Sequence, residues 1–399
     1  MYDEMNKDPI VIVGSVRTPM GGLNGVLSGM NAPELGSTAI NGAIQQSGIN
    51  IDEVEDVVMG VVLAAGQGQA PARQAAIFGG LSHNTGATTV NKMCGSGMKA
   101  LMLAHDSIMA GSNAVMIAGG MESMTNAPYL LPKVRQGMRM GHGEIKDHMF
   151  LDGLEDAFER GTLMGAYAEA TAERYQFTRE GQDEFAIRSL KRANEAISDG
   201  TFAKEIVPVN VKNRKNIVKV DFDEQPGTAS PDKIPTLRPA FAKNGTVTAA
   251  NSSSISDGAA ALVLMKMSSA ENKGLTPLAI VQAHASHSQA PQWFTTAPIG
   301  AIKSVLDKAG WVKDEVDLFE INEAFAVVTM AAMHDLAISE DIVNIHGGAC
   351  ALGHPVGASG ARIIVTLLNA LAKHDLTKGV ASLCIGGGEG VAVAIERLK

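Results

Sequence analysis

The sequence NKMCGSGMKALMLAHDSIMAGSNAVMIAG, residues 91–119, carries the clearest indication of the fold class. It opens on a glycine-rich turn, after which apolar residues recur at helical spacing from Met98 to Met109, and it closes on the apolar run Ala114–Gly119. Apolar residues three and four positions apart form one face of a helix, whereas a short apolar run beside glycine is typical of a buried strand. The stretch therefore predicts a turn, an amphipathic helix starting near Met98, and a strand.

The same alternation of strand-like and helix-like segments continues along the chain. A second helical pattern covers Ala361–Leu371. Strands covered on both faces are continuous apolar runs, and their alternation with helices indicates an α/β fold. A chain of 399 residues exceeds one ordinary core, so we expect two domains and an inserted segment. The predicted buried strands are Ile10–Gly14, Val57–Leu63, Ala114–Gly119, Leu262–Met265, Leu318–Ile321, Val380–Ile385 and Val391–Ile395.

The two ends of the chain resemble each other weakly, and the middle differs from both. Glycine-rich turns lead into helices at Cys94 and across Gly347–Gly360, which is compatible with a duplicated unit. Residues 126–244 are richer in charge, Met, Gly and Pro, and they hold helical stretches such as Arg179–Asp199 but few strand candidates. We therefore predict an excursion built onto the first half. Its Met-rich segment Leu131–Phe150 indicates either a surface loop or a contact surface for another subunit.

Composition narrows the classes of function. The net charge is −9, aromatic residues make up 4%, and no basic tract occurs, which argues against nucleic-acid binding. The start, MYDEMNKDPIVIVG, lacks the basic, apolar and small-residue order of a secretory leader. We find no apolar stretch of the roughly 18 to 20 residues that span a bilayer. These features predict a cytoplasmic protein without a membrane span.

The three cysteines differ in their surroundings. None lies in a C-x-x-C pair, which weakens zinc and dithiol redox interpretations. Cys94 precedes the predicted helix, where the positive end of the helix dipole and free N–H groups favour a thiolate and offer an oxyanion hole. Cys384 ends a predicted strand before Gly386-Gly-Gly. The sequence alone favours equally a thiol that faces a ligand and a cysteine that packs in the core. Cys350 is interpreted as a packing residue.

Two polar residues complete the candidate constellation. His354 lies in the glycine-dense segment Gly347–Gly360, and the following Pro355 restricts it to extended backbone geometry. Among the ten histidines it is the best candidate for a base that activates Cys94. Asn322 follows a predicted strand and can hold a water or a carbonyl oxygen; the alternative is an ordinary turn or helix-capping residue.

Four motifs occur in order: Cys94-Gly-Ser-Gly, Asn322-Glu-Ala-Phe, Gly353-His-Pro and Cys384-Ile-Gly-Gly-Gly. In this order and spacing the chain resembles the thiolase family over essentially its whole length, and Val11–Gly21, Ala118–Ser123 and Gly245–Gly258 also fit. The resemblance implies a duplicated five-layered α/β/α/β/α fold. It places an N-terminal domain at residues 1–275, with a loop domain inserted at about 126–244, and a C-terminal domain at residues 276–399.

The resemblance also implies roles for these residues. Cys94 would carry the acyl group, His354 would take its thiol proton, and Cys384 would remove the α-proton of a second acetyl-CoA. His354 and a water held by Asn322 would stabilise the enolate oxygen, and the N–H groups of Cys94 and Gly386 would hold the tetrahedral oxyanion. The substrates and products would be acetyl-CoA, acetoacetyl-CoA and CoA, with no metal or redox cofactor.

By the same resemblance, a group of residues would form the coenzyme A tunnel: Ser253, Ala249, Ala324, Phe325 and Met164. Three positions depart from the pattern of short-chain thiolases. Leu163 replaces a frequent His, Phe294 replaces a frequent Met, and Pro226 stands where an Arg often lies near the adenine. Lys233, Arg238 or a neighbouring subunit would then contact the phosphates.

Several activities and assemblies fit these residues. The leading expectation is reversible condensation of two acetyl-CoA, and the nearest alternative is cleavage of longer 3-ketoacyl-CoA by the same residues. A decarboxylating ketoacyl synthase of the same superfamily typically carries a second His at the place of Asn322 and has no counterpart of Cys384. A non-catalytic lipid carrier would not need both thiols beside His354. Because Leu131–Phe150 resembles the loop that joins dimers of bacterial thiolases, a homotetramer is expected, with a dimer as the alternative.

Overall fold

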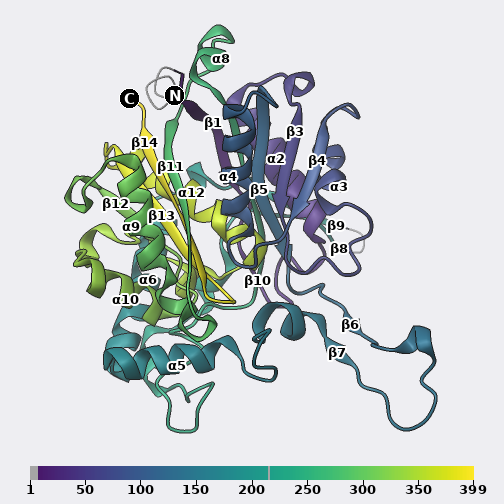
Figure 1. Ribbon diagram of the computed structural model, residues 1–399, viewed down its shortest axis with the longest axis vertical. Helices are drawn as coiled ribbons and strands as arrows, with labels where there is room; N and C mark the ends of the chain where they lie inside the picture. The colour runs from purple at the N-terminus through teal and green to yellow at the C-terminus, as the bar shows by residue number, and fades with distance from the viewer. Residues whose placement is uncertain (1–7, 214–215) are drawn as a thin grey trace.

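The computed structural model describes residues 8–213 and 216–399, and it shows alternating strands and helices (Figure 1). Met1–Lys7, which entered the prediction that no secretory leader is present, lie outside the described residues. Each predicted strand lies in or overlaps an observed one. Strands β4 and β11 were not predicted, because β4 is short and only half-buried and β11 alternates buried with more exposed residues.

Ten strands form one mixed sheet in the order β4-β3-β5-β10-β1-β11-β14-β13-β12, with β2 paired to β10. The halves of this sheet meet where β1 and β11 share only two residue pairs, Val11 with Ile280 and Ile12 with Ala279. The strands are β1 (Ile10–Arg17), β2 (Gly21–Gly22), β3 (Asp56–Gly60), β4 (Gly86–Val90), β5 (Val115–Ser123), β10 (Ser256–Lys266), β11 (Ala279–Ser288), β12 (Leu318–Ile321), β13 (Lys378–Ile385) and β14 (Glu389–Arg397).

The two halves of the sheet repeat one topology. In the first half β3 and β5 are parallel, whereas β5–β10 and β10–β1 are antiparallel. In the second half β12 and β13 are parallel, whereas β13–β14 and β14–β11 are antiparallel. The helices follow the strands in matching order. They are α2 (Ala32–Ser47), α3 (Pro71–Phe78) and α4 (Ser96–Met109) in the first half, α8 (Met267–Asn272) between the halves, and α9 (Ala297–Ala309), α10 (Ala326–Leu336), α11 (Ala349–Leu352) and α12 (Val356–Lys373) in the second.

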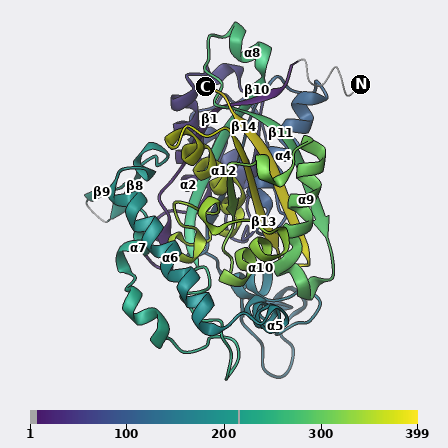
Figure 2. The ribbon, with the colours of Figure 1, turned by 90° about the vertical axis from the view of Figure 1, so that its left-hand side faces the viewer.

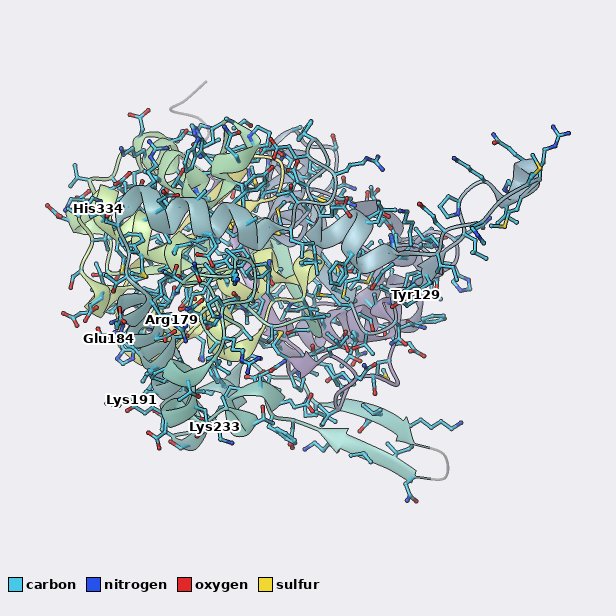
Figure 3. All side chains as sticks on the ribbon, turned by 90° about the horizontal axis from the view of Figure 1, so that it is seen from below. Tyr129, Arg179, Glu184, Lys191, Lys233 and His334 are labelled. Carbon is cyan, nitrogen blue, oxygen red and sulfur yellow. The ribbon has the colours of Figure 1, made fainter. Side chains whose placement is uncertain are left out.

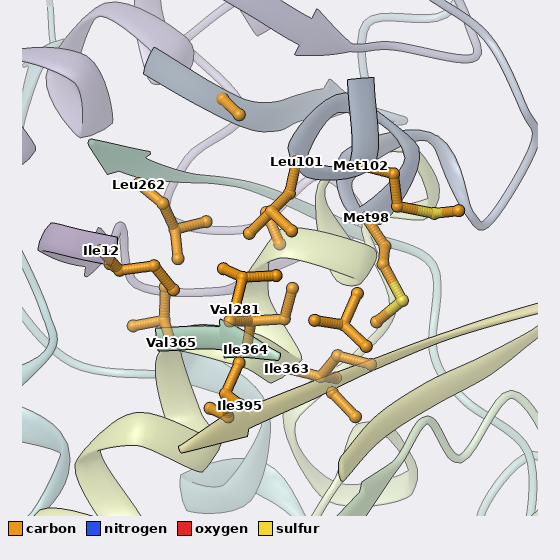
Figure 4. Packing of buried hydrophobic residues seen from close by; sticks show 14 of the residues in the cluster. Ile12, Met98, Leu101, Met102, Leu262, Val281, Ile363, Ile364, Val365 and Ile395 are labelled. Carbon is orange, nitrogen blue, oxygen red and sulfur yellow. The ribbon is translucent and has the colours of Figure 1, made fainter. Parts of the chain in front are cut away.

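The helices make five layers with the two half-sheets, which confirms the predicted fold class. Helices α2 and α3 cover the outer face of the first half, α9 and α10 cover that of the second, and α4 and α12 lie between them (Figures 1 and 2). The largest cluster of buried apolar side chains surrounds α4 and α12 and draws on both half-sheets, including Ile12, Leu101, Ile364 and Ile395 (Figure 4). This central layer therefore fixes the halves against each other.

Glycine lets the two central helices pack backbone to backbone. A Cβ added at Gly97 would lie 2.8 Å from the Ala361 nitrogen, and one added at Gly360 would lie 2.4 Å from the Met98 nitrogen. Only a hydrogen fits in such spaces. The first turns of α4 and α12 are thus held together, and the segments that immediately precede them carry Cys94 and His354.

Helix α12 corrects the expectation that no segment is long and apolar enough to span a bilayer. It has 18 residues with mean hydropathy 1.2, although 83% of it is buried inside the protein. A long, mostly apolar helix is expected where protein surrounds it. Its position in the central layer accounts for this composition.

The segment between β5 and β10 leaves the sheet, although these strands are antiparallel neighbours. Its first part forms a long arm based on the paired strands β6 and β7, and β8 and β9 form a projecting hairpin (Figures 1 and 3). The elements are β6 (Tyr129–Leu130), β7 (Lys146–Asp147), α5 (Met164–Tyr175), α6 (Arg179–Ser198), β8 (Val209–Asn213), β9 (Asn216–Val220) and α7 (Glu224–Thr228).

Candidate active site

A cavity of about 850 Å³ opens where the inserted segment meets the sheet. Residues from both halves and from the insertion line it, so it forms only in the complete fold. Most of the residues predicted from the sequence contribute to its wall: Cys94, Met164, Ala249, Ser253, Ala324, Phe325, His354 and Gly386. Asn322 and Cys384 are not part of this wall and lie buried.

Cys94 sits on a strained turn between β4 and α4. The preceding residue, Met93, has a φ of +46°, a left-handed conformation that is uncommon for a residue with a side chain. Hydrogen bonds hold it there: Met93 N–H donates to Asn91 Oδ1 at 2.9 Å, and Ser96 Oγ donates to the Met93 carbonyl at 2.6 Å. The turn thereby directs the half-buried Cys94 into the cavity.

The expectation that the helix start makes Cys94 a thiolate is wrong. Burial is the largest influence and raises the pKa of Cys94 to about 11. The backbone groups of Gly386 and of Cys94 itself lower the pKa, but by less than burial raises it, and nearby Glu122 raises it further. The thiol therefore needs a base.

His354 is held as such a base. Its Nδ1 lies 2.6 Å from Ser359 Oγ, and that hydroxyl donates to the Pro355 carbonyl at 3.1 Å. A hydroxyl that donates its only hydrogen must accept from Nδ1–H, which leaves the lone pair on Nε2. Among the described residues Nε2 has no partner, and burial lowers the pKa of His354 to about 3, so the imidazole is neutral. A neutral imidazole with a free Nε2 at a cavity wall can accept a proton.

Asn322 lies behind His354. Its Nδ2 is 3.5 Å from His354 Nδ1, too long for a strong hydrogen bond, and its Oδ1 accepts from Arg362 Nη2 at 3.3 Å. Its backbone N–H donates to the Ser382 carbonyl at 3.0 Å, which extends the parallel pairing of β12 with β13 just beyond the end of β12. Its predicted role, holding a water for the enolate oxygen, stays a prediction.

Cys384 lies at the end of β13, fully buried among aromatic rings. The ring of Phe325 packs edge-on against Phe241 and Phe294, with centroids 6.0 and 6.4 Å apart. Burial raises the pKa of Cys384 well above its usual value, and the neighbouring Cys94 raises it further. At neutral pH this group is a thiol, and it becomes a strong base once it has lost its proton.

Glu122 was not singled out from the sequence, although it lies in the segment Ala118–Ser123. Its carboxyl accepts hydrogen bonds from the N–H groups of Val62, Leu63 and Gly357 at 2.8 to 3.1 Å. It therefore ties the end of β5 to the loop after β3 and to the first turn of α12. Burial raises its pKa to about 7. No local pattern marks such a residue, since its partners come from distant segments.

The departures from the family pattern fall in different places. Leu163 and Phe294 line the cavity, as expected for positions that shape an acyl and pantetheine site. Pro226 is instead buried in α7 and lies outside the cavity wall. Lys233 and Arg238 are exposed, and among the described residues no Lys or Arg lines the cavity itself.

One group of side chains in the described ranges, 8–213 and 216–399, is close enough together to hold a metal ion: His105, Asp106 and His284. Asp106 Oδ1 lies 3.2 Å from His105 Nδ1 and 2.8 Å from His284 Nε2. These hydrogen bonds satisfy the cluster by themselves. The cluster lies outside the cavity.

Known proteins match this chain over nearly its whole length. The profile of the thiolase N-terminal domain matches residues 10–268, and that of the thiolase C-terminal domain matches residues 275–397. Acetyl-CoA acetyltransferases of Thiocystis violacea and Escherichia coli are each 48% identical, across 98% of this chain and 100% and 99% of theirs. The crystal structure of the Bacillus anthracis acetyl-CoA acetyltransferase superimposes with a TM-score of 0.95 at 40% identity, covering 98% of this chain and 99% of that one.

Proposed function

The chain belongs to the thiolase family, and from this premise we propose that it condenses two molecules of acetyl-CoA, reversibly, to acetoacetyl-CoA and CoA. One observation carries the proposal. The turn of Cys94, the free Nε2 of His354 and the N–H of Gly386 line one cavity, and the second thiol, Cys384, is buried close enough to influence the first. This set supplies a nucleophile, a base, an oxyanion donor and a second acid–base group.

The first half-reaction transfers an acetyl group to Cys94. His354 Nε2 takes the thiol proton as the sulfur attacks the thioester carbonyl, and the N–H groups of Cys94 and Gly386 hold the oxyanion. As the tetrahedral intermediate collapses, the sulfur of CoA leaves and takes its proton from Cys384. The raised pKa of Cys384 suits this step, because it keeps the group protonated until a thiolate needs the proton.

The second half-reaction forms the carbon–carbon bond. The Cys384 thiolate removes the α-proton of a second acetyl-CoA, and the protonated His354, with a water held by Asn322, stabilises the enolate oxygen. The carbanion attacks the acyl-Cys94 thioester, and the Cys94 sulfur departs and recovers its proton from His354. All protons are then back in place, so the cycle needs no metal or redox cofactor. Dialysis against EDTA should leave the rate unchanged; a loss restored by a metal would contradict this.

The cavity wall supports a small acyl group. Ser253, Ala249 and Met164 line it beside the rings of Phe294 and Phe325, and we assign these residues to pantetheine and the short acyl chain. Exposed Lys233 and Arg238, or a neighbouring subunit, contact the phosphates. Binding of CoA should therefore weaken when Arg238 is replaced by Gln, whereas kcat should change little.

A chain-length profile in both directions tests the proposal. Acetoacetyl-CoA should be the preferred substrate for thiolysis, because large buried rings border the acyl site. If a C8 or C10 3-ketoacyl-CoA were cleaved tenfold faster, the protein would be a longer-chain thiolase. Activity on malonyl thioesters without activity on acetyl-CoA would indicate a decarboxylating synthase. Absence of any labelled acyl-enzyme would indicate a non-catalytic binding protein.

We also propose a cytoplasmic homotetramer. The arm between β6 and β7 projects from the body (Figure 3) and exposes large apolar side chains, of which Met140 is 98% exposed. Isolated surface residues of this kind are ordinary, but a projecting Met-rich arm fits an inter-subunit contact. Light scattering should give four subunits, and a variant with the arm shortened should give two. An unchanged mass would refute the arm's role. All three cysteines are free thiols, in keeping with a reducing compartment.

A further inference from the structure

Two loops from opposite halves of the molecule meet at Cys94. One is the turn that carries Cys94, and the other is the glycine loop Gly386–Gly388 between β13 and β14. The turn packs closely against the end of β13, next to the glycine loop, since a Cβ added at Gly95 would lie 2.5 Å from Ile385 Cδ1. Gly386 and Cys94 both line the cavity, and the backbone of Gly386 lies near enough to the Cys94 sulfur to lower its pKa. The orientation of the Gly386 N–H relative to Cys94 therefore depends on how the two loops are held together.

The glycine loop is a short connection between two paired strands. Gly387 and Gly388 both adopt left-handed backbone angles, with φ of +93° and +92°. The pairing of Ile385 with Glu389 closes the loop, and the Gln289 N–H donates to the Gly388 carbonyl at 2.8 Å. These contacts hold the ends of the loop, whereas Gly386, the first of three successive glycines, keeps the wide backbone freedom of that residue. A donor that must meet an oxyanion within a few tenths of an ångström needs an external restraint.

One ion pair supplies such a restraint. Lys92 Nζ donates to both carboxylate oxygens of Glu389, at 2.8 and 2.7 Å. Lys92 lies two residues before Cys94, and Glu389 begins β14 directly after the glycines. Ser288 Oγ also donates to Glu389 at 3.1 Å, which orients the carboxylate. In the part of the chain that the structure describes, this pair is the only side-chain hydrogen bond between the two loops.

We propose that Lys92 and Glu389 are positioning residues for the reaction: their ion pair holds the Gly386 N–H on the Cys94 sulfur and on the oxyanion that forms beside it. The inference rests on the proposed function, because it gives the N–H its task in acyl transfer. Both side chains are partly exposed, at 23% and 33%, so the pair contributes little to folding. Its effect on catalysis is therefore separable from its effect on stability.

The test is a double-mutant cycle with Lys92→Met, Glu389→Gln and the double variant. We expect each single change to lower kcat for acetyl-CoA condensation about tenfold, with KM within twofold, because a displaced donor weakens transition-state binding only. The double variant should lose no more than either single one, since all three lack the same contact. Alkylation of Cys94 by iodoacetamide at fixed pH should slow severalfold in all three, because the sulfur loses a donor that favours its thiolate.

A matched control is the pair Lys273–Glu53, at the end of α8 and outside the cavity, with similar exposures of 28% and 38%. Lys273→Met should change neither kcat nor alkylation. Single variants with kcat within twofold of wild type, losses that multiply in the double variant, or a change in KM alone would each overturn the role. If the wild type did not condense acetyl-CoA at all, the proposed function would fail. Equal alkylation rates in all variants would instead refute the positioning role alone.

Discussion

Replacing Ser359 by alanine tests how His354 is kept ready as a base. In the structure Ser359 Oγ donates to the Pro355 carbonyl at 3.1 Å and accepts from His354 Nδ1–H at 2.6 Å. This arrangement places the proton on Nδ1 and the lone pair on Nε2, the nitrogen that has no partner among the described residues. The variant removes the acceptor and leaves a buried N–H unpaired beside Asn322.

The size of the effect follows from that lost contact. An unsatisfied buried donor costs about 1–3 kcal/mol, and the ring can escape this cost by turning or by moving its proton to Nε2. Either change removes the base from Cys94. At about 1.4 kcal/mol for each factor of ten, acylation of Cys94 should slow by about 5- to 150-fold. The KM for acetyl-CoA should stay near that of the wild type, because Ser359 does not line the cavity.

Single-turnover mixing with radiolabelled acetyl-CoA, followed by acid quench, measures the acylation rate directly. The control is Thr366→Val, which removes another buried hydroxyl from α12, one that donates to Glu205 at 3.1 Å away from the cavity. It should acylate at the wild-type rate. An acylation rate for Ser359→Ala within threefold of wild type would refute the tautomer argument. An equal loss in Thr366→Val would assign the effect to the helix as a whole.

Four further variants test the site and the side chains that hold it in place. Cys94→Ser should form no acyl-enzyme. Cys384→Ser should still be acylated but should condense acetyl-CoA about 10²- to 10⁴-fold more slowly. A condensation rate near that of the wild type would show that Cys384 is not the base. Folding raises the pKa of Glu122 from 4.5 to about 7, so the folded protein holds this proton more tightly than the unfolded chain does. The free energy of unfolding of the wild type should therefore fall by about 3 kcal/mol between pH 4.5 and pH 7, relative to that of Glu122→Gln. Urea titrations at each pH measure the free energy of unfolding. The same dependence on pH in the wild type and in Glu122→Gln would contradict this prediction. Asp223→Ala should lower the free energy of unfolding by about 3–5 kcal/mol in the same assay, because it removes a bidentate partner of the buried Arg17 guanidinium. A loss below about 1 kcal/mol would show that water replaces the missing carboxylate.

Much of the fold was predictable because short-range sequence patterns specify its helices and buried strands. Apolar periodicity marks α4 and α12, and apolar runs mark the buried strands, since each element is covered by others in a regular way. The same holds for Cys94 and His354, whose glycine-rich segments each precede a central helix. Strand β11 escaped prediction because its residues alternate between buried and more exposed.

Residue type and short-range spacing were enough to predict the α/β class, the family and a set of candidate reacting side chains, because these features lie within short stretches of the chain. The protonation and hydrogen bonding of these side chains became clear only from the tertiary structure. It showed that burial outweighs the helix start at Cys94, that Ser359 sets the tautomer of His354, and that Lys92 meets a partner 297 residues away. Desolvation and such long-range contacts depend on how the layers stack, and no local pattern encodes the stacking.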